Sequence, residues 1–260
     1  MVIPFSKYNG AGKEFILIDN RTTKLNLTSQ QIVQLCHRQL GIGADGIMLL
    51  EKDSSADFRL RNYNSDGNEG NLCGNGGRCI VKFAELLGII ANKATFTGID
   101  GDHEAIVIDE NTVRLKMKQV DEIINSDDYY IINTGSYHYV QFVVETDYID
   151  VNYQGKVISD LYQTQYGAVD VSFAQYTPDG IKVRTYEHRV KAETLASGSG
   201  AIATAIAANH WFKEKHNTYS IIALGGILKV SFDKISDSQY HNVWSEGPVS
   251  HIFDGSINLG

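Results

Sequence analysis

The chain has 260 residues, of which 43% are hydrophobic, 21% charged and 10% aromatic. These fractions are typical of a folded globular protein, and the length allows one large domain or two smaller ones. The formal net charge of −8 and the lack of a basic stripe argue against nucleic-acid binding. The sequence contains neither a run of 18 apolar residues nor a secretory signal, so we expect a cytoplasmic protein without a membrane span.

Alternation of apolar and polar residues predicts short strands along most of the chain. We expect them at residues 15–19, 47–51, 58–63, 104–108, 113–118, 139–144, 181–186, 228–232 and 251–257. Three windows indicate helices instead, at residues 29–40, 75–87 and 199–213. The first follows a capping box from Thr28 to Gln31, and the third is apolar on nearly every face, which predicts a helix through the middle of a domain.

The three cysteines are Cys36, Cys73 and Cys79, an odd number without a C-x-x-C pair. This pattern favours neither a disulfide framework nor a zinc site, and the scattered histidines imply no metal. Cys36 and Cys79 lie on apolar helix faces, so we interpret them as buried and inert. Cys73 is flanked by glycines that would leave it uncovered.

An internal repeat is the most informative feature of the sequence. In each copy a strand leads through a polar stretch into a glycine turn and then a helix, and the copies lie 123 or 124 residues apart. The matched segments are Phe58–Tyr63 with Ile181–Tyr186, Cys73–Gly77 with Ser197–Ala201, and Tyr8–Gly12 with Ile132–Ser136. We therefore predict an α+β fold of two pseudo-symmetric domains, each a mostly antiparallel sheet rolled around a central helix. The predicted halves are residues 1–122 plus 249–260 and residues 123–248.

A glycine turn that opens a helix presents unpaired backbone N–H groups and the positive end of the helix dipole, which together bind an anion. Two such turns related by pseudo-symmetry could hold one carboxylate or phosphate between them. Cys73 stands at the first turn, where a thiol is acidified and becomes a usable base. Ser197 stands at the second turn.

These segments resemble the diaminopimelate epimerase family in order and spacing over essentially the whole chain. The resemblance is carried by Lys7–Gly12, Gly41–Gly46, Asn64–Gly67, Cys73–Gly76, Tyr186–Glu187, Glu193–Gly200, Gly247–Val249 and Phe253–Gly255. It implies two pseudo-symmetric halves with the active site in the cleft. It also implies inversion of an amino-acid α-carbon by two cysteines, without pyridoxal phosphate (PLP) or metal, as in lysine biosynthesis.

Ser197 occupies the second cysteine position of the family. A hydroxyl does not share the near-neutral acidity of a thiol, so a strict two-thiol mechanism should be impaired. Three explanations stay open: an engineered Cys→Ser change that traps substrate, a natural enzyme with Ser197 as proton donor, or one-base chemistry such as elimination.

Three further positions depart from the family pattern. Lys13 and Asp170 stand where the family has Asn, and His188, followed by Arg189, stands where it has Arg. In the family these groups help to hold the distal carboxylate of diaminopimelate. An Asp would repel that carboxylate, and His is a weaker, pH-dependent partner. Either these changes are neutral, or the substrate is another amino acid.

The prediction is a PLP-independent amino-acid epimerase or racemase that acts by two-base proton transfer, with LL-/meso-diaminopimelate as default substrate. The alternatives are a racemase of an amino acid such as histidine, without a distal carboxylate, a one-base lyase or isomerase, and an amino-acid binding protein. We assign catalysis to Cys73 and Ser197, and substrate binding to Lys13, Asn64, Gly74, Asn75, Asp170, Glu187, His188, Gly198 and Ser199. We expect no cofactor or metal, an amino acid as the partner, no nucleic acid or membrane, and consider a homodimer.

Overall fold

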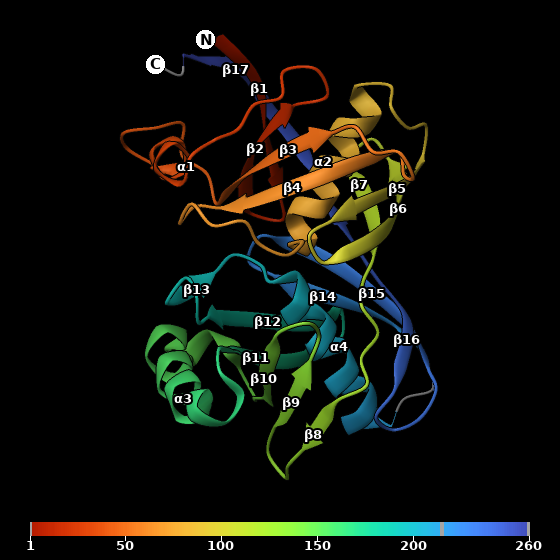
Figure 1. Cartoon of the computed structure of the whole chain (residues 1–260). Coiled ribbons are helices and arrows are strands. Elements are labelled where there is room, and N and C mark those ends of the chain that lie inside the picture. The colour runs from red at the N-terminus through yellow and green to blue at the C-terminus, as the bar shows by residue number, and fades with distance from the viewer. Residues whose placement is uncertain (1, 214–215, 259–260) are drawn as a thin grey trace. The chain divides into compact units, whose positions relative to one another are not determined.

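The computed structural model describes residues 2–213 and 216–258 (Figure 1). Contacts divide the chain into two compact units. The first consists of the residues up to Leu115 together with those from Gly247 onward, and the second is Lys116–Glu246. The sequence analysis instead predicted the boundaries after residue 122 and after residue 248.

The first unit carries ten strands and helices before and after the second unit. They are β1 (Val2–Gly10), β2 (Lys13–Asp19), α1 (Ser29–Cys36), β3 (Gly46–Glu51), β4 (Phe58–Asn64), α2 (Gly74–Leu86), β5 (Lys93–Gly98), β6 (Gly101–Asp109), β7 (Thr112–Lys116) and β17 (Ser250–Asn258). β1 pairs antiparallel with both β2 and β17, so the last strand of the chain completes the sheet that the first strand begins.

The second unit contains the remaining elements. They are β8 (Ile123–Asn125), β9 (Tyr130–Asn133), β10 (Tyr137–Phe142), a 3-10 turn (Thr146–Tyr148), α3 (Val151–Tyr166), β11 (Val169–Thr177), β12 (Gly180–Glu187), β13 (Ala192–Thr194), α4 (Gly198–Phe212), β14 (Thr218–Ala223), β15 (Gly226–Lys234) and β16 (Tyr240–Pro248).

The two units repeat one order of strand pairing. In the first, β2 is parallel to β3, β3 antiparallel to β4, β4 parallel to β5, and β5 antiparallel to β6. In the second, β10, β11, β12, β14 and β15 follow the same sequence of parallel and antiparallel pairs. The helix between the two strands of the second parallel pair is α2 in one unit and α4 in the other. The predicted α+β class with mostly antiparallel sheets is confirmed.

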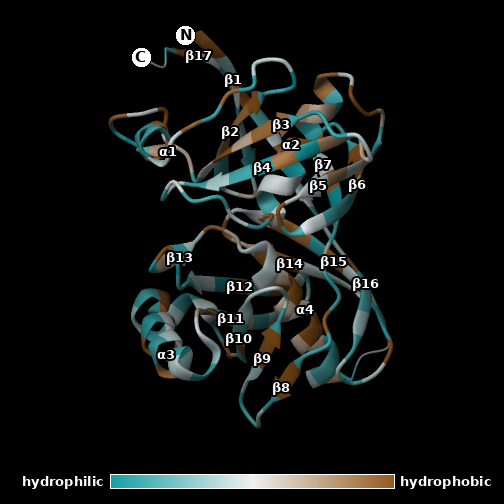
Figure 2. Cartoon of the chain, viewed as in Figure 1, coloured by the Kyte–Doolittle hydropathy of each residue, from teal (hydrophilic) through white to brown (hydrophobic). Residues whose placement is uncertain are grey.

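Each unit has a buried helix as its centre. α4 is buried along almost its whole length, from Gly198 to Asn209, as its uniformly apolar sequence predicts. α2 is buried from Gly74 to Ala84, apart from Lys82, which lies partly exposed. Figure 2 shows that α3, by contrast, consists largely of hydrophilic residues.

The sequence analysis missed α3, a helix of 16 residues. Its buried residues are Val151, Gly155 and Ser159, spaced four apart and mostly small. A Cβ at Gly155 would lie 2.4 Å from the Tyr186 Cβ, so this helix packs through close approach and not through a hydrophobic stripe. The first predicted helix also ends earlier than expected, at Cys36.

Candidate active site

The tip of the β1–β2 hairpin packs on the first turn of α2, within the first unit. Ala11 and Gly12 both have positive φ, at 51° and 89°, as a tight hairpin turn requires. A Cβ at Gly10 would lie 2.5 Å from the Asn75 carbonyl oxygen, so only glycine allows this approach. Lys13 begins β2 opposite Gly10, which places it at the hairpin tip that contacts α2.

Cys73 is the residue that precedes the first turn of α2, with extended backbone angles of φ −85° and ψ 126°. Its thiol is free and partly exposed, and it makes no capping hydrogen bond. Helix geometry leaves the N–H groups that follow Cys73 without partners inside the helix, and Gly74 and Asn75 supply two of them. The predicted thiol at a helix N-terminus is therefore present, although its catalytic role stays a prediction.

Part of the glycine bunch after Cys73 serves packing between helix and sheet. A Cβ at Gly76 would lie 2.0 Å from the Met48 Cε, and one at Gly77 would lie 2.8 Å from a Leu115 methyl. Gly76 and Gly77 therefore leave room for side chains of the protein's own sheet. Gly74 itself is buried.

The other two thiols lie in the core, as the sequence analysis expected. Cys36 and Cys79 are both buried and unpaired. Burial raises the pKa of each to about 12, and the nearby Arg78 guanidinium only partly opposes this rise at Cys79. Among the three thiols, Cys73 alone is partly exposed.

Arg78 is a fully buried cation on α2 that the sequence analysis did not single out. Its Nη2 donates a hydrogen bond of 2.6 Å to the Asn75 side-chain oxygen, while Nε and Nη1 have no partner. Burial lowers the pKa of Arg78, and the thiols of Cys79 and Cys73 oppose this effect. One signal was available, because Arg78 is a lone charge in an otherwise small and apolar stretch of helix.

Asn64 ends β4 and begins the turn that leads toward Cys73. A Cβ at Gly70 would lie 2.4 Å from Asn64 Nδ2, so Gly70 packs directly against the side-chain amide of Asn64. The Asn64 backbone N–H donates to the Asn68 carbonyl over 2.9 Å, and its own carbonyl accepts from Gly67 over 3.0 Å. The turn therefore fixes Asn64, which is partly exposed.

Ser197 takes the position in the second unit that Cys73 takes in the first. Its Oγ accepts a hydrogen bond of 3.1 Å from the Gly200 N–H and lies 3.4 Å from the Ser199 Oγ. Ser197 is thus a conventional helix N-cap and is 8% exposed. Gly198 is buried beside it, and Ser199 is partly exposed.

Asp170 and His188, two of the positions that depart from the family pattern, belong to one network in the second unit. Asp170 Oδ1 accepts a hydrogen bond of 2.8 Å from the His188 backbone N–H. His188 Nδ1 lies 2.9 Å from the Ser159 Oγ of α3. Glu187 is buried next to them, and its Oε1 accepts from the Thr194 hydroxyl over 3.1 Å.

His138 completes this network and was missed, because His188 is the only histidine that the sequence analysis assigned to the site. It pairs with Asp170 in the register of β10 and β11, and its Nε2 lies 3.9 Å from Asp170 Oδ2. His138 is fully buried, and its Nδ1 has no partner. Burial lowers the pKa of His138, while Asp170 and Glu187 oppose that shift. An alternating strand with His on its inward face could have indicated this position.

The structure therefore groups the predicted site residues by unit. The first unit brings together Lys13, Gly74 and Asn75 with Cys73, through the contact between hairpin and helix. The second unit brings Asp170 together with Glu187 and His188, and sets Gly198 and Ser199 at the helix that Ser197 caps.

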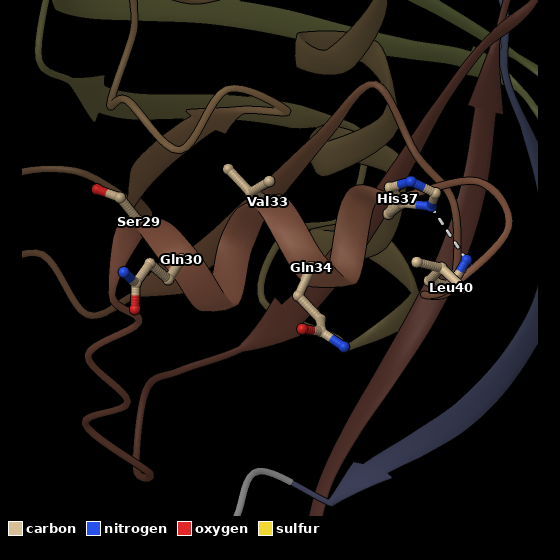
Figure 3. Close-up of a pocket in the computed structure, with 6 residues that line it drawn as sticks. All are labelled: Ser29, Gln30, Val33, Gln34, His37 and Leu40. Carbon is tan, nitrogen blue, oxygen red and sulfur yellow. Dashed lines mark hydrogen bonds between the residues drawn. The ribbon is translucent and has the colours of Figure 1, made fainter.

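A surface hollow of about 360 Å³ lies elsewhere, along α1 (Figure 3). It is lined by Ser29, Gln30, Val33, Gln34, His37 and Leu40, none of which belongs to the predicted site. Within residues 2–213 and 216–258, no three His, Cys, Asp or Glu side chains are grouped so as to hold a metal ion. The helices in that part of the chain are all too short or too polar to cross a membrane.

Comparison with known proteins gives one consistent result. A family model described as diaminopimelate epimerase matches residues 5–122 and 130–252. The diaminopimelate epimerase of Flavobacterium psychrophilum is 45% identical over 255 residues, which covers 96% of this chain and 98% of that protein. That of Chlorobaculum tepidum is 36% identical over 263 residues, covering 96% and 100%.

Solved structures share the fold at low identity. A phenazine biosynthesis protein of the PhzF family from Bacillus anthracis has a TM-score of 0.76 at 11% identity, with both chains fully covered. A hydroxyproline epimerase from Agrobacterium vitis has a TM-score of 0.72 at 13% identity, covering 98% of this chain and 92% of that one. At these identities the likeness concerns the fold, and it agrees with the α+β class described above.

Proposed function

Because the chain belongs to the diaminopimelate epimerase family, as its family-model match and its relatives show, we propose that it is a PLP-independent amino-acid epimerase. Its default substrates are LL- and meso-diaminopimelate, which the names of its relatives support. The observation that carries the proposal is the free, uncapped thiol of Cys73 at the start of the buried helix α2.

Cys73 acts as the base. Its thiolate takes the α-proton of the amino acid and becomes a thiol, while the electron pair of the C–H bond passes to the α-carbon and its carboxylate. The resulting carbanion is unstable in water and needs hydrogen-bond donors around the developing charge. Backbone N–H groups at the helix starts, those of Gly74, Asn75, Gly198 and Ser199, supply these donors.

Ser197 delivers a proton to the opposite face of the α-carbon. Its O–H bond breaks, the proton goes to carbon, and the alkoxide that is left recovers a proton from water. The Gly200 N–H, which already donates to Oγ over 3.1 Å, stabilises that alkoxide. The hydroxyl still loses its proton less readily than a thiol, so this half of the reaction is the slower one.

Proton exchange in deuterium oxide tests the proposal. The protein is incubated with LL-diaminopimelate, and α-deuterium and stereoisomer content are followed by NMR and chiral chromatography. We expect deuterium at the α-carbon of the wild type and none with Cys73→Ala. A wild type and a Ser197→Cys variant that both leave the α-proton in place would contradict the proposal, while an alkene or keto product would show a lyase.

A second substrate class is favoured by the acidic network of the second unit. Asp170 and Glu187 place two carboxylates beside the fully buried His138, and His188 is tied to Ser159. Such a site attracts a cation and repels a distal carboxylate. A racemase of a cationic or imidazole amino acid therefore exchanges the α-proton of lysine, ornithine or histidine faster than that of diaminopimelate in the same assay. The reverse order would remove this candidate.

We propose a cytoplasmic location, which rests on the chemistry of the thiol. Cys73 must stay reduced to act as a base, and reducing compartments keep isolated thiols in that state. All three cysteines are free in the structure. Fractionation of cells that express the tagged chain would test this location.

A further inference from the structure

The turn between β5 and β6 contacts the segment that leads into α2, within the first unit. Asp100 is the second of the two residues that join these strands. Its Oδ2 accepts a hydrogen bond of 3.3 Å from the backbone N–H of Leu72, the residue directly before Cys73. The Asp100 side chain therefore links the hairpin to the start of the helix.

The peptide unit that joins Asn71 to Leu72 is held at both of its polar groups. Its N–H donates to Asp100, and its C=O, which belongs to Asn71, accepts a hydrogen bond of 2.8 Å from Asn62 Nδ2. Asn62 lies on β4 and is buried. Because a peptide unit is planar, it cannot rotate without breaking one of these bonds, so the two side chains fix its orientation.

The Leu72 side chain adds a third attachment. Its two methyl groups would lie 3.1 and 3.3 Å from a Cβ at Gly77, the fourth residue of α2, so Leu72 packs directly on the helix. A contact between these two positions is a hydrophobic staple, which fixes the direction in which a chain enters a helix. Cys73 stands between this held segment and the helix, and its backbone is therefore fixed on both sides.

Asp100 is itself held in place by His103. Its Oδ1 lies 3.1 Å from His103 Nε2, and both side chains are 9% exposed. The His103 ring stacks on Phe96 of β5 with 5.0 Å between the centroids. A Cβ at Gly98 would lie 3.0 Å from Asp100 Oδ1, so glycine leaves the space that the pair occupies. Burial alone would raise the pKa of Asp100, yet hydrogen bonds from His103 and the Leu72 N–H bring it below its ordinary value.

The second unit makes the same contact with backbone atoms alone. There the two-residue turn between β14 and β15 ends with Gly225, whose N–H donates a hydrogen bond of 2.7 Å to the Leu195 carbonyl. Leu195 corresponds to Asn71 at the repeat offset of 124 residues, so the turn holds the same peptide unit before each helix. A contact that different atoms make in the two units is a property of the shared fold. In the first unit it depends on a side chain, which a substitution can remove.

We propose that Asn62 and Asp100, which we call the peptide clamp, are positioning residues for Cys73. By holding the peptide unit before it, they keep the thiol at one position relative to the start of α2. This inference rests on the proposed function only in that Cys73 is the base. A group that transfers a proton must keep its distance and direction to the reacting carbon, and a displacement of about 1 Å can cost about 10²-fold in rate.

NMR of the protein without substrate tests the clamp, so its failure is distinct from failure of the proposed function. Asp100→Ala should speed hydrogen exchange of the Leu72 amide about tenfold or more, because its acceptor is lost. The Cys73 backbone signals should broaden or double, because the freed peptide unit takes more than one orientation. Asp100→Asn keeps an oxygen acceptor and should restore both properties. The control Asp102→Ala removes an exposed carboxylate from the same hairpin and should change neither.

Kinetics of α-proton exchange then separate positioning from substrate binding. Asp100→Ala should lower kcat about tenfold or more and leave KM within about twofold, and Asp100→Asn should recover most of kcat. Asn62→Leu removes the donor to the other end of the peptide unit, and serves if thermal unfolding shows that Asp100→Ala does not fold. Unchanged Leu72 exchange and a single, unshifted set of Cys73 signals in the folded variant overturn the proposal. A wild-type kcat in that variant overturns it too, as does an equal loss in Asp102→Ala.

Discussion

The starts of α2 and α4 occupy equivalent places in the two units, yet they are built for different chemistry. The Cys73 side chain makes no capping hydrogen bond to α2 and its thiol is free. The Ser197 hydroxyl oxygen, by contrast, accepts a capping hydrogen bond at the start of α4. The first helix also carries the buried cation Arg78, and the second unit contains an acidic network around His138. One repeated scaffold thus carries a partly exposed thiol at one helix start and a hydroxyl that caps the helix at the other.

The largest expected effect comes from removing the thiol. Cys73→Ala should reduce α-proton exchange by about 10²- to 10⁴-fold, because no other group in that turn can serve as the base. Cys36→Ala is the matched control, since it removes a buried thiol and should cost stability with little loss of exchange. Deuterium incorporation followed by NMR checks both variants, and equal losses in the two would contradict the assignment.

Making the second helix start like the first should speed inversion. Ser197→Cys places a thiol where the hydroxyl now donates its proton, and the rate of inversion should rise by about tenfold or more. Chiral chromatography of the product measures it. An unchanged or lower rate in the folded variant would show that position 197 does not face the reacting carbon.

Two other substitutions at these positions should change stability in opposite directions. Ser197→Ala removes the bond from the Gly200 N–H and should lower the free energy of unfolding by about 1 kcal/mol. Cys73→Ser adds a capping residue to a helix that has none and should raise it by up to about the same amount, while it abolishes exchange. Urea unfolding at neutral pH checks both values, and two changes of the same sign would contradict the comparison.

The smallest effect concerns the buried imidazole. Because burial lowers the pKa of His138 below its ordinary value of 6.5, the unfolded chain binds a proton there before the folded chain does. Stability contributed by neutral His138 is therefore complete above about pH 6.5 and is lost as the pH falls below it, by at most about 1.4 kcal/mol per pH unit. His138→Gln should flatten this slope in urea unfolding between pH 7.5 and 5.5. An equal slope in both proteins would contradict the shift.

The sequence analysis predicted the structural features that depend on the local sequence pattern. Alternation located nine of the 17 strands in the described residues, and the repeat predicted both central helices, with α2 and α4 beginning within a residue of expectation. The free thiol of Cys73 followed from its flanking glycines. These features rest on neighbours in the chain, which a reader of the sequence can see.

What was missed depends on contacts between distant segments. α3 packs through Gly155 against Tyr186 and shows no hydrophobic stripe, although the repeat places it where α1 lies in the first unit. Arg78 and His138 matter because of burial, which residue type alone does not indicate for charged or polar side chains. The Asp170 network was hidden because its partners come from three separate elements.

The most direct test of the difference between the two helix starts measures α-proton exchange and inversion of the α-carbon in one experiment. On the proposed mechanism, Cys73 exchanges its proton with solvent in deuterium oxide and returns deuterium to the same face, while Ser197 delivers to the other face more slowly. The account predicts that deuterium enters recovered LL-diaminopimelate faster than the stereoisomer forms, and that Ser197→Cys brings the two rates together. Inversion that keeps pace with exchange in the wild type would contradict it.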